Sequence, residues 1–227
     1  VATHEEFGRE PEPEFLKPFW DLIRAGMLDV EPPTHTRLRR LVSKAFTARM
    51  VEGLRPMIRG LAEELAGALV AKGGGDLLAE VAEPLPVNVI AEMLGVPEED
   101  RPLLRPWSAD ICGMYELNPS PEAQRAAVRA AVEFSGYLRG LARERRAAPR
   151  DDLISALAQV VDEEGDRLTE DELIGTCVLL LNAGHEATVN ATGNGWWALF
   201  REPGELARLR DDPALVPSAV DELMRFD

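Results

Sequence analysis

The sequence predicts a mainly α fold with a minor β component. Apolar residues recur at helical spacing in almost every segment, and clusters of Gly and Pro separate those segments. No segment alternates apolar and polar residues as a half-buried strand does, and the punctuation of strand–helix–strand units is missing. We therefore expect a single helical domain over residues 1–227, with a long central helix at about residues 170–202.

The helix boundaries follow from these breakers. Pro32 and Pro33 precede the first strong helical pattern, and three consecutive glycines, at 73–75, end the second. The loop at 115–120 is short and polar and contains Pro119, so it is interpreted either as a mobile lid or as an ordinary connector. The helices expected from the pattern span residues 34–46, 48–72, 87–94, 98–114, 121–146, 151–162 and 169–202, followed by a short helix to 211 and a last one from 216.

The long helix carries the most informative residues. Thr169 and Glu172 fit a capping box at its start, and Pro203 ends it, which gives a span of ~33 residues or ~50 Å. Its interior contains Gly184, although Gly in a helix costs ~1 kcal/mol relative to Ala. It also contains Glu186, and a buried carboxylate is tolerated only when it is paired, hydrogen-bonded or protonated. These two residues indicate either a chemical role or a core helix with a satisfied Glu.

Composition excludes several classes of protein. With 45% hydrophobic residues, the 227-residue chain can bury a sizeable core. Its net charge of -15 argues against nucleic-acid binding. Polar residues interrupt the long apolar run well before the ~20 residues that a membrane span needs. Cys112 and Cys177 are too few for a disulfide framework or a zinc site, and their apolar surroundings are typical of inert thiols. We expect a cytoplasmic protein that binds neither nucleic acid nor membrane.

The two ends suggest a longer protein. Residues 1–14 are polar and acidic and show no signal-peptide pattern, and the first residue is Val rather than Met. The last residues stop within an amphipathic pattern that has no capping signal. The expectation is that both ends have been cut.

Two further pairs of residues lie at helical spacings. His35 and Arg39 are four residues apart, so both side chains lie on one helix face and can hold a pair of carboxylates. The alternative is a solvated basic face. Glu222 and Arg225 are three residues apart, a spacing that is common for ion pairs on helix surfaces.

The order and spacing of these motifs resemble the bacterial soluble cytochromes P450, which are haem-thiolate monooxygenases. The resemblance extends from Met27 to Asp227. It is carried by the Pro-Thr-His-Thr-Arg-Leu-Arg-Arg-Leu segment at 33–41, by Ala-Gly-His-Glu at 183–186, and by Glu222 with Arg225.

This resemblance implies an activity and a cofactor. The chain would belong to an oxidoreductase that inserts one oxygen atom from O2 into a lipophilic small molecule, with haem b (iron protoporphyrin IX) as its cofactor. His35 and Arg39 would hold the two haem propionates through charge-assisted bonds. Ala183 and Gly184 would leave room for oxygen on the distal side of the haem.

The remaining motif residues receive roles in the same way. Glu186 matches the distal acid that helps to deliver protons toward dioxygen. Glu222 and Arg225 match a buried charge network that supports the haem-binding core. Both roles are implied by the family resemblance.

The chain departs from the family pattern at two places. The Thr that usually follows the acid is replaced by Ala187, and Thr188 lies ~100° further round the helix. We therefore predict that protons travel through ordered water or through a hydroxyl of the substrate. The Cys that ligates the iron in this family would lie beyond Asp227, so the chain contains no metal ligand and is expected to be inactive by itself.

The electron donor must be another protein, because the chain contains no flavin or dinucleotide fingerprint. Five basic residues and no acidic residue lie between His35 and Arg49. Arg37, Arg40 and Lys44 would face outward and dock an acidic ferredoxin or flavodoxin. A solvated basic face is again the alternative.

Two other functions fit parts of the sequence less well. A ferritin-like di-iron bundle needs Glu-x-x-His pairs, and none of the three His residues has a Glu three residues before it. A non-enzymatic helical module that binds a hydrophobic ligand or a partner protein would explain the apolar helices. It would not explain why Gly184 and Glu186 lie in the middle of a helix.

Overall fold

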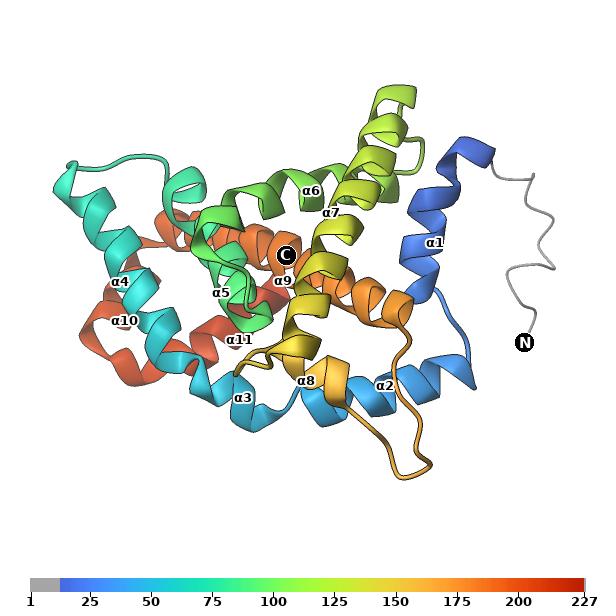
Figure 1. Cartoon of the computed structure of the whole chain (residues 1–227). Helices are drawn as coiled ribbons and strands as arrows, with labels where there is room; N and C mark the ends of the chain where they lie inside the picture. Colours follow the sequence, from blue (N-terminus) through green and yellow to red (C-terminus); the bar gives the residue numbers. More distant parts are fainter. Residues whose placement is uncertain (1–12, 227) are drawn as a thin grey trace. The chain divides into compact units, whose positions relative to one another are not determined.

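The computed structural model describes residues 13–226, and these residues form helices joined by turns (Figure 1). Residues 1–12 and 227 lie outside this range, and so do His4 and most of the polar segment at the start of the chain. The mainly α prediction is confirmed. The minor β component is not found within residues 13–226, where no segment has the alternation or the extended partner that a strand needs.

In chain order, the elements are η2 (Glu14–Leu16), α1 (Lys17–Ala25), α2 (Thr34–Ala45), α3 (Ala48–Gly53), α4 (Arg55–Ala71), η3 (Leu78–Ala82), α5 (Pro84–Leu94), η4 (Glu98–Leu103), α6 (Leu104–Cys112), η5 (Gly113–Tyr115), α7 (Pro121–Ala147), α8 (Leu153–Gln159), α9 (Glu170–Arg201), α10 (Pro203–Asp211), η6 (Pro213–Leu215) and α11 (Val216–Phe226).

Most helices agree with the predicted ranges, and the differences have local causes. The helix expected at 48–72 is divided into α3 and α4 after Gly53, because Pro56 fits only in the first turn of a helix. The helix expected at 98–114 begins as the 3₁₀ segment η4, which contains Pro102, and ends as η5. The helix α8 is shorter than the predicted 151–162.

The capping box of the long helix is confirmed. The backbone N–H of Thr169 donates to Oε2 of Glu172 at 2.8 Å, and the N–H of Glu172 donates to Oγ1 of Thr169 at 3.2 Å. The helix α9 then continues for 32 residues to Arg201. None of the helices in the described part of the chain is both long and apolar enough to cross a membrane.

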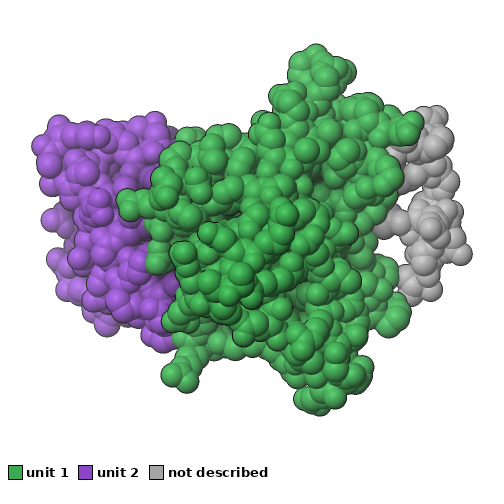
Figure 2. All heavy atoms as spheres, viewed as in Figure 1, with its two compact units in different colours: residues 1–51, 91–182 green, residues 52–90, 183–227 purple. Residues whose placement is uncertain are grey.

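The chain divides into two compact units, which Figure 2 shows in green and purple. Unit 1 contains residues 1–51 and 91–182, and unit 2 contains residues 52–90 and 183–227. The helix α9 contributes its first part to unit 1 and its second part to unit 2. That residues 1–227 form a single domain remains a prediction.

Unit 1 is built around α7, against which α1, α6 and α8 pack. Trp107 of α6 stacks on Phe134 of α7, with ring centroids 5.1 Å apart. Where α1 ends, Gly175 of α9 approaches the chain so closely that a Cβ on this residue would lie 2.6 Å from the backbone N of Gly26. Aromatic stacking and this close approach fix the helices of unit 1 against one another.

A buried ion pair ties α7 to α8 in unit 1. Arg145 is only 1% exposed, and its guanidinium donates to Oδ2 of Asp152 and, at 2.7 Å, to the carbonyl of Gly95. Gly95 has a φ of +80°, and a Cβ at this position would collide with Oδ2 of Asp152. Glycine is therefore required here both for its backbone conformation and for the space beside the carboxylate.

Candidate functional site

The middle of α9 presents a face of small side chains. Ala183 and Ala187 are four residues apart and both are exposed, so two methyl groups lie one turn apart on this face of the helix. Glu186 lies between them in sequence, and its side chain is 41% exposed. The small side chains leave the backbone of α9 accessible at these two positions, and the role predicted for Ala183 stays a prediction.

Gly184 lies beside a side chain of another helix. A Cβ on Gly184 would lie 2.6 Å from Cδ1 of Ile90 in α5, and the predicted role of this glycine in leaving room for oxygen stays a prediction. The side chain of Ile90 thus occupies the space beside Gly184. In unit 2, the absence of a side chain at Gly184 allows Ile90 of α5 to pack against α9. The exposed small side chains of this region are those of Ala183 and Ala187.

Thr188 and Ala187 face different surroundings. Thr188 lines an apolar hollow of unit 2 together with residues of α10 and α11, and Ala187 does not line it. The hollow has a volume of about 540 Å³. This arrangement follows from the rotation of ~100° between successive helical residues.

His185 lies next to Glu186, and the sequence predicted no role for this histidine. It is 3% exposed, and its Nδ1 lies 3.7 Å from Oε1 of Glu186. A buried imidazole next to a half-exposed carboxylate was detectable in the sequence only as two adjacent ionisable residues in a helix interior.

The cations of α2 fall into two groups. Arg37 forms an ion pair with Glu172, Arg40 with Asp162 and Glu164, and Lys44 lies 3.8 Å from Glu163. The side chains of His35 and Arg39, in contrast, form no hydrogen bond or ion pair within residues 13–226. The helix thus keeps one pair of cationic or hydrogen-bonding side chains available for an anion.

The predicted docking surface of Arg37, Arg40 and Lys44 stays a prediction, and the structure adds acidic neighbours to it. The acidic turn at 162–166, which follows α8, supplies carboxylates to Arg40 and Lys44. Burial acts to raise the pKa of Asp162, but the N–H of Asp166, the guanidinium of Arg40 and the N–H of Glu164 together hold that pKa below its usual value. The positive charge of Arg37, Arg40 and Lys44 is therefore largely neutralised within unit 1.

Glu222 and Arg225 form the predicted pair on α11. The guanidinium donates from Nε to Oε2 at 2.9 Å and from Nη2 to Oε1 at 2.6 Å. Both side chains are exposed rather than buried, so the buried network that the resemblance implied is not present in the described residues. The hydrogen bonds from Arg225 lower the pKa of Glu222.

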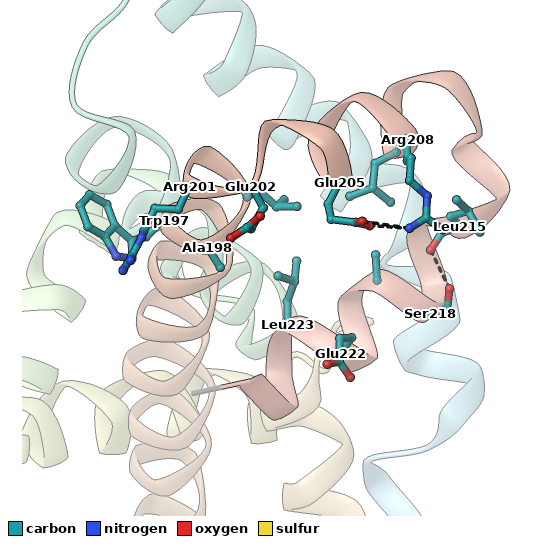
Figure 3. Close-up of a pocket in the computed structure, with 13 residues that line it drawn as sticks. Trp197, Ala198, Arg201, Glu202, Glu205, Arg208, Leu215, Ser218, Glu222 and Leu223 are labelled. Carbon is teal, nitrogen blue, oxygen red and sulfur yellow. Dashed lines mark hydrogen bonds and ion pairs between the residues drawn. The ribbon is translucent and has the colours of Figure 1, made fainter.

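A second hollow of unit 2 lies where the end of α9 meets α10 and α11 (Figure 3). It has a volume of about 570 Å³, with Leu215 and Leu223 in its lining. Charged side chains lie at its edge, including Glu205, which accepts from Arg208 at 2.7 Å. The sequence did not predict this hollow, because its lining comes from four separate helical elements, α9, α10, η6 and α11.

Neither Cys112 nor Cys177 forms a disulfide. Cys177 is fully buried, and burial raises its pKa to about 12, which agrees with an inert thiol. Within the part of the chain that the structure describes, His, Cys, Asp and Glu side chains form no group of three that could hold a metal ion.

Comparison with known proteins identifies relatives that match most of the chain. Cytochrome P450 CYP107DY1 of Priestia megaterium is 44% identical over 207 residues, which cover 91% of this chain and 50% of the relative. Cytochrome P450 monooxygenase PikC of Streptomyces venezuelae is also 44% identical, over 90% of this chain and 48% of the relative. A solved structure of P450BioI, in complex with an acyl carrier protein that carries hexadec-9Z-enoic acid, superimposes with a TM-score of 0.89.

This chain belongs to the cytochrome P450 family. The P450BioI match has 35% sequence identity and covers 96% of this chain and 56% of that chain. No protein-family model matches the sequence. The chain spans about half the length of the curated P450s that it matches. The resemblance predicted from the motifs is thus confirmed. The residues that carry it in the sequence lie on α2, α9 and α11.

Proposed function

We propose that the protein is a haem-dependent monooxygenase that inserts one oxygen atom from O2 into a lipophilic small molecule. The observation that carries this proposal is the contrast along α2, where His35 and Arg39 have no side-chain partner among residues 13–226 although the other cations of the helix are ion-paired. In a chain with a net charge of -15, an Arg and a His side chain that have no internal partner are suited to an anionic ligand.

The residues present fit haem b. The porphyrin has two carboxylates, and His35 with Arg39 supplies two donors that lie one helical turn apart. The methyl face of Ala183 and Ala187 suits a flat apolar ring. When bound, the haem supplies the activation of dioxygen.

Glu186 is proposed as the acid that passes protons toward the oxygen. Its half-exposed carboxylate can exchange protons with water, and the imidazole of His185 lies beside it. Because Ala187 has no hydroxyl, the last step of the transfer is proposed to run through ordered water or a hydroxyl of the substrate. Thr188 is not suited to supply the missing hydroxyl, because it lines a hollow that Ala187 does not line.

The electrons are proposed to come from a ferredoxin or flavodoxin that docks on Arg37, Arg40 and Lys44. Because these residues have internal partners, the donor has to compete with Glu163, whose side chain is 94% exposed, and with Glu164. Charge reversal by Arg40→Glu is expected to slow reduction by the donor and to weaken its salt dependence. Unchanged kinetics would contradict this docking surface.

Lipophilic substrates and a cytoplasmic location complete the proposal. Among the relatives are a vitamin D(3) 25-hydroxylase of Pseudonocardia autotrophica and a 6-deoxyerythronolide B hydroxylase of Saccharopolyspora erythraea, names that support a bulky apolar substrate. Two cysteines that form no disulfide support a reducing compartment. By itself the chain is proposed to be inactive, with the axial Cys supplied from beyond Asp227.

The test compares haem retention in full-length protein. Replacing His35 and Arg39 by Leu is expected to lower the Soret absorbance per protein at least several-fold, because two donors to the propionates are lost. Replacing Thr36 and Arg49 by Leu is the matched control and is expected to leave the Soret absorbance unchanged, since both residues are exposed and neither is a proposed haem donor. A colourless wild-type protein that refuses added hemin would leave the alternative, a helical module that binds a hydrophobic ligand or a partner protein.

A further inference from the structure

The acidic turn between α8 and α9 is shaped by hydrogen bonds to Asp162. The backbone N–H groups of Glu164 and Asp166 donate to Oδ1 of Asp162 at 2.9 and 2.8 Å. The backbone N–H of Asp162 donates to the carbonyl of Asp166 at 3.0 Å, and Gly165, with a φ of +85°, allows the chain to reverse here. These bonds fix the backbone of the turn, and the carboxylates of Glu163 and Glu164 take no part in them.

The carboxylates of this turn that face the cations of α2 differ in burial. Asp162 pairs with Arg40, and its side chain is fully buried. Glu164 accepts from the same guanidinium at 3.1 and 3.3 Å, but its side chain is 71% exposed. Glu163, whose Oε1 lies 3.8 Å from Nζ of Lys44, is 94% exposed. Because exposed ion pairs contribute little to stability, another carboxylate can displace the two glutamates at small cost, whereas Asp162 stays in place.

Arg37, the third cation of the proposed docking surface, is held more firmly. Its partner Glu172 has a side chain that is only 16% exposed. The other carboxylate oxygen of Glu172 accepts from the N–H of Thr169 in the capping box, so this acid is part of the start of α9. A partner displaces it only by disturbing that helix end. The contacts that an incoming protein can exchange are therefore those of Arg40 and Lys44.

We propose that Glu163 and Glu164 form an autoinhibitory acidic cover over Arg40 and Lys44, which an acidic electron donor displaces when it docks. This inference rests on the proposed function and concerns the regulation of the same surface. All four residues belong to unit 1. The cover presents to the two cations the chemistry that an acidic donor brings, exposed carboxylates on a preshaped loop. A protein with a weaker negative surface does not displace it, so the cover also selects the partner.

The test compares two charge-matched double variants of the full-length haem protein. The cover variant combines Glu163→Gln with Glu164→Gln and keeps the backbone bonds to Asp162. The control variant combines Asp110→Asn with Asp166→Asn, which removes the same charge. Both of its sites are exposed, one of them lies in the same turn, and neither side chain forms an ion pair among the described residues. Both variants are expected to unfold within about 2 °C of the wild type.

Binding is measured by fluorescence anisotropy with two labelled probes, poly-L-glutamate and a plant-type two-iron ferredoxin, and neither readout uses the haem. At about 0.01 M salt, the cover variant is expected to bind poly-L-glutamate about fivefold more tightly than the wild type, and the control variant less than about twofold. At about 1 M salt, where charges are screened within about 3 Å, the three proteins are expected to bind equally. Adding Lys44→Gln to the cover variant is expected to reverse part of the gain, which locates the probe on this surface.

The outcomes separate this inference from the proposed function. Equal binding of poly-L-glutamate by the cover and control variants overturns the cover, as does a gain that persists at about 1 M salt or the absence of binding by all variants. A clearly lower unfolding temperature of the cover variant overturns it as well, because Glu163 and Glu164 would then hold the turn. A gain with poly-L-glutamate but no binding of ferredoxin supports the cover and contradicts ferredoxin as the donor. A protein without haem overturns the proposed function, whereas the poly-L-glutamate result still decides the cover.

Discussion

A Cβ on Gly184 would lie 2.6 Å from Cδ1 of Ile90, so a side chain at residue 184 would overlap with the end of the Ile90 side chain in unit 2. The first prediction follows from this relationship. Gly184→Ala gains up to about 1 kcal/mol of helix propensity, but it forces the end of the Ile90 side chain to move, which costs about 1–3 kcal/mol. The single variant is expected to be neutral or less stable than the wild type.

Ile90→Val provides the control, because Val lacks the Cδ1 atom. In the Ile90→Val background, Gly184→Ala is expected to stabilise the protein by up to about 1 kcal/mol. Urea unfolding of the four proteins of this double-mutant cycle gives the coupling free energy. Equal effects of Gly184→Ala in the two backgrounds would show that Ile90 does not set the identity of residue 184.

The second prediction concerns Gly175. A Cβ at this position meets backbone atoms of residues 25 and 26, which cannot rotate away as a side chain can. Gly175→Ala is therefore expected to destabilise the protein by about 1–3 kcal/mol in spite of its better helix propensity. Gly136→Ala in α7 is the control, because a Cβ there meets no atom within 4 Å, and it is expected to stabilise by up to about 1 kcal/mol. Thermal unfolding distinguishes the two variants.

The third prediction is a pH dependence of stability at Asp162. The folded state lowers the pKa of this carboxyl, so the charged form stabilises the fold above the unfolded pKa of about 4. This contribution is lost as the pH falls through the lower, folded pKa. Asp162→Asn is thus expected to be less stable than the wild type at pH 7 and to approach it in acid.

Asp110→Asn is the reference for the Asp162 variant. Asp110 is exposed on α6, and its side chain makes no ion pair within residues 13–226. Its replacement is expected to leave the difference from the wild type constant between neutral and acidic pH. A constant difference for Asp162→Asn as well would show that Arg40 and the turn do not hold the charged carboxylate.

The fourth prediction concerns the proton path at Ala187. If ordered water or a substrate hydroxyl completes the path, Ala187→Thr is expected to change peroxide release on some substrates and not on others. The measurement is the ratio of hydrogen peroxide to oxygenated product in the reconstituted full-length enzyme. A sharp fall in peroxide release on every substrate tried would exclude a path through the substrate.

The sequence predicted the features that depend on local chemistry. The long helix α9 and its capping box follow from the spacing of Thr169 and Glu172, and the fold class follows from apolar periodicity. The division between α3 and α4 was missed, because the weak signals of Gly53 and Pro56 lie within a continuous helical pattern.

The ion pairs of α2 could not be predicted in the same way. Arg37 and Glu172 are 135 residues apart, and Arg40 and Asp162 are 122 residues apart. Their pairing depends on how the segment after α8 packs against α2, and a charge pattern contains no such distance. The same holds for Gly184, whose neighbour Ile90 lies on another helix.

Gly95, Arg145 and Asp152 bear on how this chain can change over evolution. A Cβ at residue 95 collides with the carboxylate that neutralises Arg145, and the Gly95 carbonyl accepts from the same guanidinium. A larger residue at position 95 requires the loss of the Asp152 carboxylate. Loss of that carboxylate alone leaves the buried guanidinium of Arg145 without its counter-charge, which is strongly destabilising. The three positions are therefore expected to mutate together, so the turn after α5 should be among the slowest parts of the chain to diverge.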